Sequence, residues 1–263
     1  MTRHLIDENK KFIENAWDDA SLTPERLLVA LNKIEEDEKS IKEKTLVEPT
    51  QKEWDHFYKN HNDRFFKDRN WILKEFTEVN KNKKILEVGC GTGNTLSTLD
   101  FERNKIYGCD FSSIAIEIAK DRFPKGTFFI YDITSDNDFP YSGFDIVFLI
   151  YTLSAIPPHL HIKVVNKLTS ILNPGGIICF KDYGRLDMVQ LRYKSEQIID
   201  QNLYRRKDGT ITYFFTTEAL ENLFKEYEIR NLFEDKRLII NRKKKLEMYR
   251  IWIQGEFKKK LNI

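Results

Sequence analysis

Three glycines at alternate positions follow directly on an apolar run, and this feature most constrains the fold. The run is Ile85–Val88, and the glycines are Gly89, Gly91 and Gly93. Such a run predicts a buried strand that ends in a turn where the backbone approaches a ligand closely. Asp110 ends the next apolar run, about twenty residues on, where a carboxylate accepts hydrogen bonds from ribose hydroxyls. Together they predict a parallel α/β sheet that holds a nucleoside.

The spacing of the glycines limits which class of nucleoside the loop can bind. The loop has the form G-x-G-x-G with Glu87 two residues before the first glycine, which differs from the G-x-G-x-x-G of dinucleotide enzymes. It also lacks the Lys-Ser/Thr ending of a triphosphate-binding loop. This form resembles the S-adenosylmethionine loop of class I methyltransferases. The alternative is a strand-to-helix turn that needs glycine for its geometry alone.

From Lys84 onward the sequence alternates as β-α-β units do, and 263 residues with 41% hydrophobic residues suffice for one large core. We expect strands at 84–88, 105–109, 127–131, 144–150, 177–182, 228–240 and 247–256. We expect helices at 93–99, 112–122, 158–172 and 217–227. Residues 183–215, rich in Arg, Tyr and Phe, interrupt this alternation as an insertion. The main domain is therefore expected at residues 83–263.

Two segments precede that domain. Residues 1–50 are expected to form a mobile helical extension, with Thr23 as cap and Pro24 in the first turn. Residues 51–82 are rich in aromatic and basic side chains, among them Trp54, Tyr58 and Phe65. From composition alone, these aromatics are core residues that pack a helix on the sheet; closing over a ligand is the other role open to them.

Charge and cysteine content limit the class of protein. The net charge is only +2, so the whole chain is no polycation, but residues 236–260 carry ten Lys or Arg residues. This basic end is either a contact surface for an anion or a solvated tail. Cys90, Cys109 and Cys179 lie in or beside apolar strands without metal-ligand spacing, so we expect reduced buried thiols and no metal site. With no signal peptide or membrane span in view, we expect a cytoplasmic protein, with the nucleus as a second compartment.

Other strand ends should face the same ligand, because open α/β sheets bind ligands at the carboxyl ends of their strands. Asp132 follows the third expected strand and can accept an adenine amino group while Ile133 packs on the ring. Ile150 ends the fourth strand, and residues 150–154 would line the reaction centre. Asp182 ends the fifth strand; it either contacts a substrate or holds the turn that follows it.

Several segments resemble the signature segments of tRNA 3-methylcytidine methyltransferases, and the similarity covers about residues 50–258. They are Trp54–Lys59, Arg64–Trp71, Lys181–Gly184, Asp208–Thr210, Tyr213–Thr216, Asn241–Arg242 and Met248–Gln254. Residues Asn15–Asp19 also resemble the branch that acts on threonine tRNA. Lys181 departs from the pattern, since Arg is expected there and lysine lacks the planar fork that makes a bidentate contact.

The resemblance implies a class I Rossmann-like methyltransferase: a mostly parallel seven-stranded sheet with helices on both faces and a helical N-terminal extension. It implies S-adenosylmethionine-dependent methylation of N3 of cytidine 32 in the anticodon loop of threonine or serine tRNAs. The partners would be the tRNA anticodon stem-loop and an aminoacyl-tRNA synthetase or other accessory protein, and the chain would be a monomer. Cofactor-binding roles fall to Trp54, Tyr58, Glu87, Gly89, Gly91, Asp110, Asp132, Ile133 and Ile150.

RNA contacts are expected from three regions. Arg64, Lys67 and Arg69 would meet phosphates, as the resemblance implies. The insertion offers guanidinium groups and rings that unstacked bases can stack on: Tyr193, Tyr204, Arg205, Arg206, Tyr213, Phe214 and Phe215. Arg192, Arg237, Arg242, Lys243, Lys244 and Lys245 could follow the phosphate backbone. For each of these the alternative is an ordinary surface residue.

The chemistry needs no base, because N3 of neutral cytosine already has an available lone pair. The base must be unstacked and aligned with the methyl donor, and the product is cationic. A carboxylate stabilises that charge as it develops, and Asp182 is the candidate catalytic residue. Two other functions use the same glycine loop: a class I methyltransferase for a protein or small molecule, and an inactive RNA-binding subunit.

Overall fold

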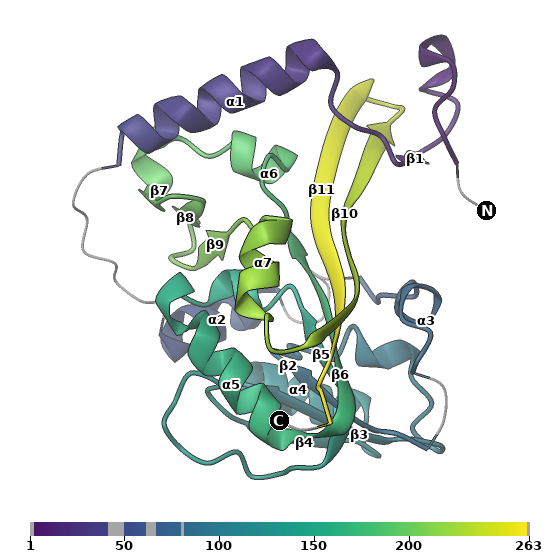
Figure 1. Cartoon of the computed structure of the whole chain (residues 1–263), viewed down its shortest axis with the longest axis vertical. Coiled ribbons are helices and arrows are strands. Elements are labelled where there is room, and N and C mark those ends of the chain that lie inside the picture. Colours follow the sequence, from purple (N-terminus) through teal and green to yellow (C-terminus); the bar gives the residue numbers. More distant parts are fainter. Residues whose placement is uncertain (1–2, 42–49, 62–66, 80–81, 262–263) are drawn as a thin grey trace.

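The computed structural model describes residues 3–41, 50–61, 67–79 and 82–261. A twisted eight-stranded sheet runs through the molecule in the order β1-β10-β11-β6-β5-β2-β3-β4 (Figure 1). The strands are β1 (Ala16–Asp18), β2 (Lys84–Val88), β3 (Lys105–Asp110), β4 (Thr127–Ile130), β5 (Phe144–Ile150), β6 (Leu172–Tyr183), β10 (Glu228–Asn241) and β11 (Leu246–Lys258). Strands β2 to β6 are parallel, whereas β11, β10 and β1 join antiparallel.

Some helices pack on the two faces of this sheet, and others lie beyond the ends of its strands. They are α1 (Pro24–Lys39), α2 (Gln51–His61), α3 (Ile72–Glu75), α4 (Ser113–Arg122), α5 (His161–Ile171), α6 (Met188–Leu191) and α7 (Thr217–Leu223). Successive residues of a strand point to opposite faces. In β5, Val147 and Leu149 accordingly pack with α5 and α7, while Ile146 and Phe148 pack with α3 and α4. The expected Rossmann-like arrangement is therefore present.

The N-terminal extension is only partly helical. Helix α1 begins as expected, with Pro24 in its first turn and the Thr23 hydroxyl accepting the Arg26 N–H. Residues 16–18, however, form strand β1, so the sheet has eight strands rather than seven. Trp17 explains the difference, because its buried ring packs with Leu238 and Tyr249 of the hairpin β10–β11.

Several other elements differ from the expected ones. Strand β6 begins at Leu172 rather than at residue 177, and α7 ends at Leu223 rather than at residue 227. The helix expected at 93–99 is a single 3-10 turn, η3 (Leu96–Thr98). The insertion is folded: it holds α6, a 3-10 turn η6 (Ser195–Gln197) and a separate antiparallel sheet of β7 (Ile198–Asp200), β8 (Leu203–Arg205) and β9 (Ile211–Tyr213). Three further 3-10 turns are η1 (Glu8–Lys10), η4 (Leu153–Ala155) and η5 (Pro158–Leu160).

Helix α1 joins the hairpin to the insertion across the upper part of the view in Figure 1. At its beginning, Arg26 donates to Glu247 of the hairpin at 2.8 Å. Near its end, the Tyr204 hydroxyl donates to the buried Asp37 carboxylate at 3.3 Å. The extension, the tip of the hairpin (residues 242–245) and the insertion thus form one layer beyond the carboxyl ends of the parallel strands. In the described part of the chain, no helix has both the length and the apolar character that crossing a membrane demands.

Candidate active site

The glycine loop after β2 is shaped by close contacts that exclude side chains. Gly89 has a φ of +66°, and a Cβ there would lie 2.4 Å from the Thr152 methyl group. Gly91 has a φ of +53°, and a Cβ there would lie 2.6 Å from the Tyr58 hydroxyl. Both positions need glycine for two reasons: a Cβ would clash with these neighbours, and other residues avoid a positive φ. The loop therefore packs closely against Thr152 and Tyr58, with no room for a side chain at either glycine.

Asp110 at the end of β3 fixes this loop. Its Oδ2 accepts the Gly91 N–H and its Oδ1 accepts the Ser112 N–H, each at 2.9 Å. Burial raises the pKa of the Asp110 carboxyl to about 6, and the backbone N–H groups oppose that rise. Each carboxylate oxygen keeps a further lone pair for a ligand hydroxyl.

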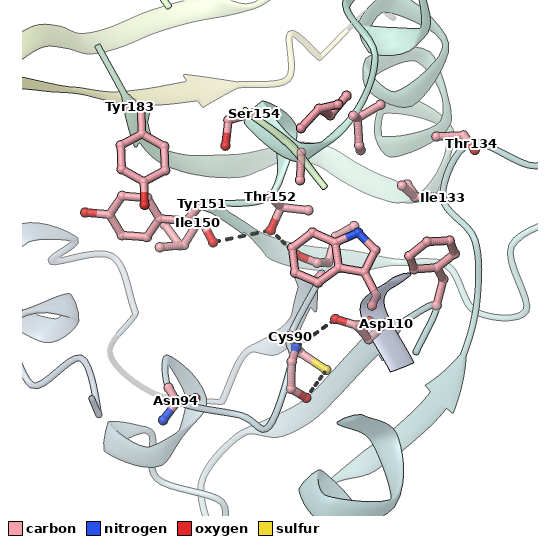
Figure 2. A pocket seen from close by; sticks show the side chains of 18 of the residues that line it. Cys90, Asn94, Asp110, Ile133, Thr134, Ile150, Tyr151, Thr152, Ser154 and Tyr183 are labelled. Atoms are coloured by element: carbon pink, nitrogen blue, oxygen red, sulfur yellow. Dashed lines mark hydrogen bonds between the residues drawn. The ribbon is translucent and has the colours of Figure 1, made fainter. Parts of the chain in front are cut away.

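A cavity of about 370 Å³ lies over the ends of β2 to β6 (Figure 2). Most of the expected cofactor residues line it: Trp54, Tyr58, Gly89, Gly91, Asp110, Asp132, Ile133 and Ile150. Trp54 and Tyr58 come from α2, which is held on α4 by a hydrogen bond of 2.6 Å from Ser112 to Asp55. The cavity is therefore walled by the strand ends on one side and by α2 on another.

Glu87 is absent from that lining. Its carboxyl group is fully buried below the loop, 3.4 Å from the Arg69 guanidinium, and its Oε2 has no hydrogen-bond partner. Burial raises the pKa of Glu87 to about 8, and Arg69 opposes the rise. The structure thus places Glu87 where it holds Arg69.

The segment from Lys67 to Arg69 lies against the glycine loop. Arg69 donates its backbone N–H to the Asn94 carbonyl at 2.9 Å, and Asp68 accepts from the Asn94 amide and from Arg122. Exposed Lys67 and partly buried Arg69 both line the cavity. Arg64 lies outside the described residues.

Aromatic and cationic side chains wall the other half of the cavity. Tyr151 and Tyr183 lie with ring centroids 5.4 Å apart, and Arg206, Arg250 and Trp252 complete this wall. Of these, only Arg206 and the Tyr151 region were expected. Tyr183 could have been found from its place at the end of a strand. Trp252 lies in the middle of β11 and reaches the cavity by pairing with Tyr183.

Asp182 lies behind this wall rather than in it. Its side chain is fully buried, and its two oxygens accept the N–H groups of Ser154 and Tyr183, each at 2.9 Å. Ser154 and Tyr183 line the cavity, whereas Asp182 is absent from the lining. These contacts favour the second of the two expected roles, in which Asp182 holds the adjoining turn.

The expected RNA residues fall into three environments. Arg192 and the hairpin tip Arg242–Lys245 are exposed, and Arg242 donates to the Ile13 carbonyl at 3.2 Å. Arg205 and Tyr213 are half-buried, and so is Arg237. Phe214 is 0% exposed and packs against Tyr204 in the core of the insertion, so its ring is not presented to a base.

The same burial applies to other rings of the insertion. Phe215 and Tyr204 are buried, and Tyr193 stacks on Tyr204 with centroids 4.9 Å apart. Tyr193, Tyr204 and Phe214 therefore build the core of the insertion, whereas Phe215 packs with Phe180 in the core of the main sheet. Among the described residues, no three His, Cys, Asp or Glu side chains gather as a metal ion would require.

Comparison with known proteins identifies relatives. A family described as "Methyltransferase domain" matches residues 58–232. The tRNA N(3)-methylcytidine methyltransferase Mettl2 of Drosophila melanogaster is 38% identical, over 99% of this chain and 88% of its own. The tRNA(Thr) (cytosine(32)-N(3))-methyltransferase of Saccharomyces cerevisiae is 36% identical, over 97% of this chain and 45% of its own.

Solved structures resemble the fold. A SAM-dependent methyltransferase from Anabaena variabilis superimposes with a TM-score of 0.62 at 14% identity, covering 84% of this chain and 98% of that chain. A methyltransferase from Methanosarcina mazei gives a TM-score of 0.57 at 18% identity, covering 75% and 100%. At such identities the likeness concerns the fold alone.

Proposed function

The chain belongs to the family of tRNA N(3)-cytidine methyltransferases, and we propose that it transfers a methyl group from S-adenosylmethionine to N3 of cytidine 32 in the anticodon loop. The observation that carries this proposal is the two-part cavity. One half has the loop, acid and aromatic side chains suited to a nucleoside, and the other half has rings and guanidinium groups suited to a base. Both halves open into one another, as methyl transfer requires.

S-adenosylmethionine fits the first half. The free lone pairs of the Asp110 carboxylate suit the ribose hydroxyls, and Ile133 offers an apolar contact for adenine. Asp132 is exposed at the rim and accepts from Thr134 in its own turn. The bound cofactor would supply an electrophilic methyl group; the residues named here bind and orient it.

The second half suits a flipped cytosine. Rings of Tyr151, Tyr183 and Trp252 can stack on an unstacked base, and their faces attract the positive charge that methylation of N3 creates. N3 attacks with its own lone pair, so alignment is the main catalytic task. We call this second half of the cavity the base subsite. We assign Asp182 to the alignment, because it accepts the backbone N–H groups of Ser154 and Tyr183, which both line the cavity.

We further propose that threonine or serine tRNAs are the substrates and that the exposed hairpin tip and Lys67 contact their phosphates. The protein would act as a monomer in the cytoplasm or nucleus, with a synthetase or other accessory protein as partner. The relatives named above support the tRNA substrate. Arg64 and Arg192 remain candidates for the same phosphate contacts.

The test is methyl transfer by the purified protein to threonine-tRNA transcripts, alone and with the threonyl-tRNA synthetase added. The nucleosides are then separated and weighed. We expect 3-methylcytidine. Methylation of another nucleoside, of added protein or of a small molecule would contradict the proposal.

A further inference from the structure

A buried ammonium group joins three elements just behind the cavity. Lys181 in β6 is 3% exposed, and its Nζ donates to Glu75 Oε2 at 2.6 Å, to Asp235 Oδ2 at 2.6 Å and to Gln254 Oε1 at 2.8 Å. An ammonium group has three N–H donors, so all of them are used. The acceptors come from α3, β10 and β11, and α3 is far in sequence from the hairpin that β10 and β11 form.

A second cation completes the cluster. Arg237 donates to Glu75 Oε1 and to Asp235 Oδ1, each at 2.8 Å, so each carboxylate is shared by both cations. Two carboxylates and two cations balance in charge, and removal of either cation would leave a buried carboxylate without full compensation. The four side chains therefore hold a single arrangement of α3 against β6 and the hairpin.

Aromatic rings extend the cluster to the cavity. The Lys181 ammonium lies 4.6 Å from the centroid of the Trp71 ring and 5.8 Å from that of Trp252, within reach of cation–π attraction. Trp252 itself lines the cavity. Trp71 follows Arg69, another lining residue, by two positions, and Lys181 precedes Asp182 directly. Lys181 thus touches or adjoins three separate parts of the wall without lining it.

We propose that Lys181 is a positioning residue for methyl transfer, which sets Trp252, the Arg69 segment and the end of β6 at fixed distances around the base subsite. The inference rests on the proposed function. Its geometry explains the departure from Arg at this position, because three acceptors from three directions match an ammonium and not a planar fork.

The test compares Lys181→Met with Arg230→Met. The control removes the Arg230–Glu78 pair, 3.0 Å long and partly exposed, which also joins β10 to the segment after α3 but away from the cavity. With both substrates saturating, kcat of Lys181→Met should fall about tenfold or more, as expected when a wall is displaced. The cofactor Kd should stay within about twofold in both variants, and kcat of Arg230→Met should stay unchanged.

Two further variants disturb the cluster less than Lys181→Met does, so they test the proposal even if Lys181→Met fails to fold. Gln254→Met removes one acceptor and leaves every charge compensated; we expect kcat to fall about threefold with a Tm near that of the wild type. Lys181→Arg keeps the charge and should recover part of the kcat that Lys181→Met loses.

Equal kcat in wild type, Lys181→Met and Gln254→Met would overturn the inference while leaving the proposed function intact. A loss of kcat that merely follows Tm in all variants, Arg230→Met included, would overturn it too. A wild type that forms no 3-methylcytidine would overturn the proposed function, and the inference with it.

Discussion

The guanidinium of Arg69 lies 3.4 Å from the fully buried carboxyl group of Glu87. The first residue was expected to meet RNA and the second to meet the cofactor, yet in the structure they meet each other. Arg69 also donates to the Thr95 hydroxyl and lies 5.2 Å from the centroid of the Tyr151 ring. This pair therefore connects the glycine loop to the wall of the base subsite.

Glu87→Gln tests whether the carboxyl group of Glu87 carries a proton in the folded chain. Burial raises the pKa of Glu87 from 4.5 to about 8, so the folded chain binds the extra proton and its free energy of unfolding falls as pH rises between these values. One proton changes this free energy by at most about 1.4 kcal/mol per pH unit. Denaturant unfolding from pH 6 to 8 should show a steeper fall in the wild type than in Glu87→Gln. Parallel curves would contradict the assignment.

Cofactor affinity should depend on the ionisation of Asp110. Burial raises the pKa of this carboxyl to about 6, and its ionised form is the better acceptor for ribose hydroxyls. Calorimetry should find Kd constant above pH 7 and rising below pH 6. Asp110→Asn should bind about tenfold or more weakly, because hydrogen bonds to a charged group contribute about 1.5–3 kcal/mol. Equal affinity at pH 5 and pH 8 in the wild type would speak against a carboxylate–ribose contact.

Asp182→Asn separates positioning from direct contact with the base. The carboxylate accepts two backbone N–H groups, whereas an amide has one acceptor oxygen and would turn its NH2 toward the other donor. Loss of one such bond should lower the free energy of unfolding by about 1–3 kcal/mol together with kcat, while the cofactor Kd changes little. A fall in kcat with unchanged stability would instead indicate that Asp182 contacts the base.

The hairpin tip should contribute charge to tRNA binding. Replacing Lys243, Lys244 and Lys245 by Ala should weaken binding and reduce the slope of log Kd against log salt by about 0.7–0.9 for each phosphate that is no longer neutralised. A matched control replaces exposed Lys105, Lys120 and Lys225, which changes the net charge equally. Equal effects of the two triple variants in a filter-binding titration would show that net charge, not the hairpin, matters.

The parallel strands could be predicted because their signals are local. Apolar runs of five to seven residues bounded by turn signals gave β2 and β5 at their observed bounds, and the acid at the end of β3 gave Asp110. Strand β1 could not be predicted, because three residues become a strand only by pairing with β10, more than two hundred residues away. The short turn at Leu96–Thr98 likewise depends on its tertiary surroundings.

Site residues could be predicted where a glycine or an acidic residue lies at the end of a strand. They could not be predicted where the role of a side chain depends on whether the fold buries it. Phe214 and Lys67 both looked available to RNA, but only the fold shows that one is buried and the other exposed. Glu87 belongs to the glycine motif, yet its place below the loop follows from the segment that brings Arg69 over it. When a side chain contacts a residue far along the chain, the spacing of nearby residues gives no signal of that contact.

The central claim is methylation of one cytidine, and it is tested most directly with a pair of threonine-tRNA transcripts that carry cytidine or uridine at position 32. Both are incubated with the protein, the methyl donor and any required synthetase, and fragments of the anticodon loop are weighed by mass spectrometry. We predict a single added methyl group on the fragment with cytidine 32, located to 3-methylcytidine, and none on the uridine transcript. Equal methylation of both transcripts, or of neither, would contradict the account.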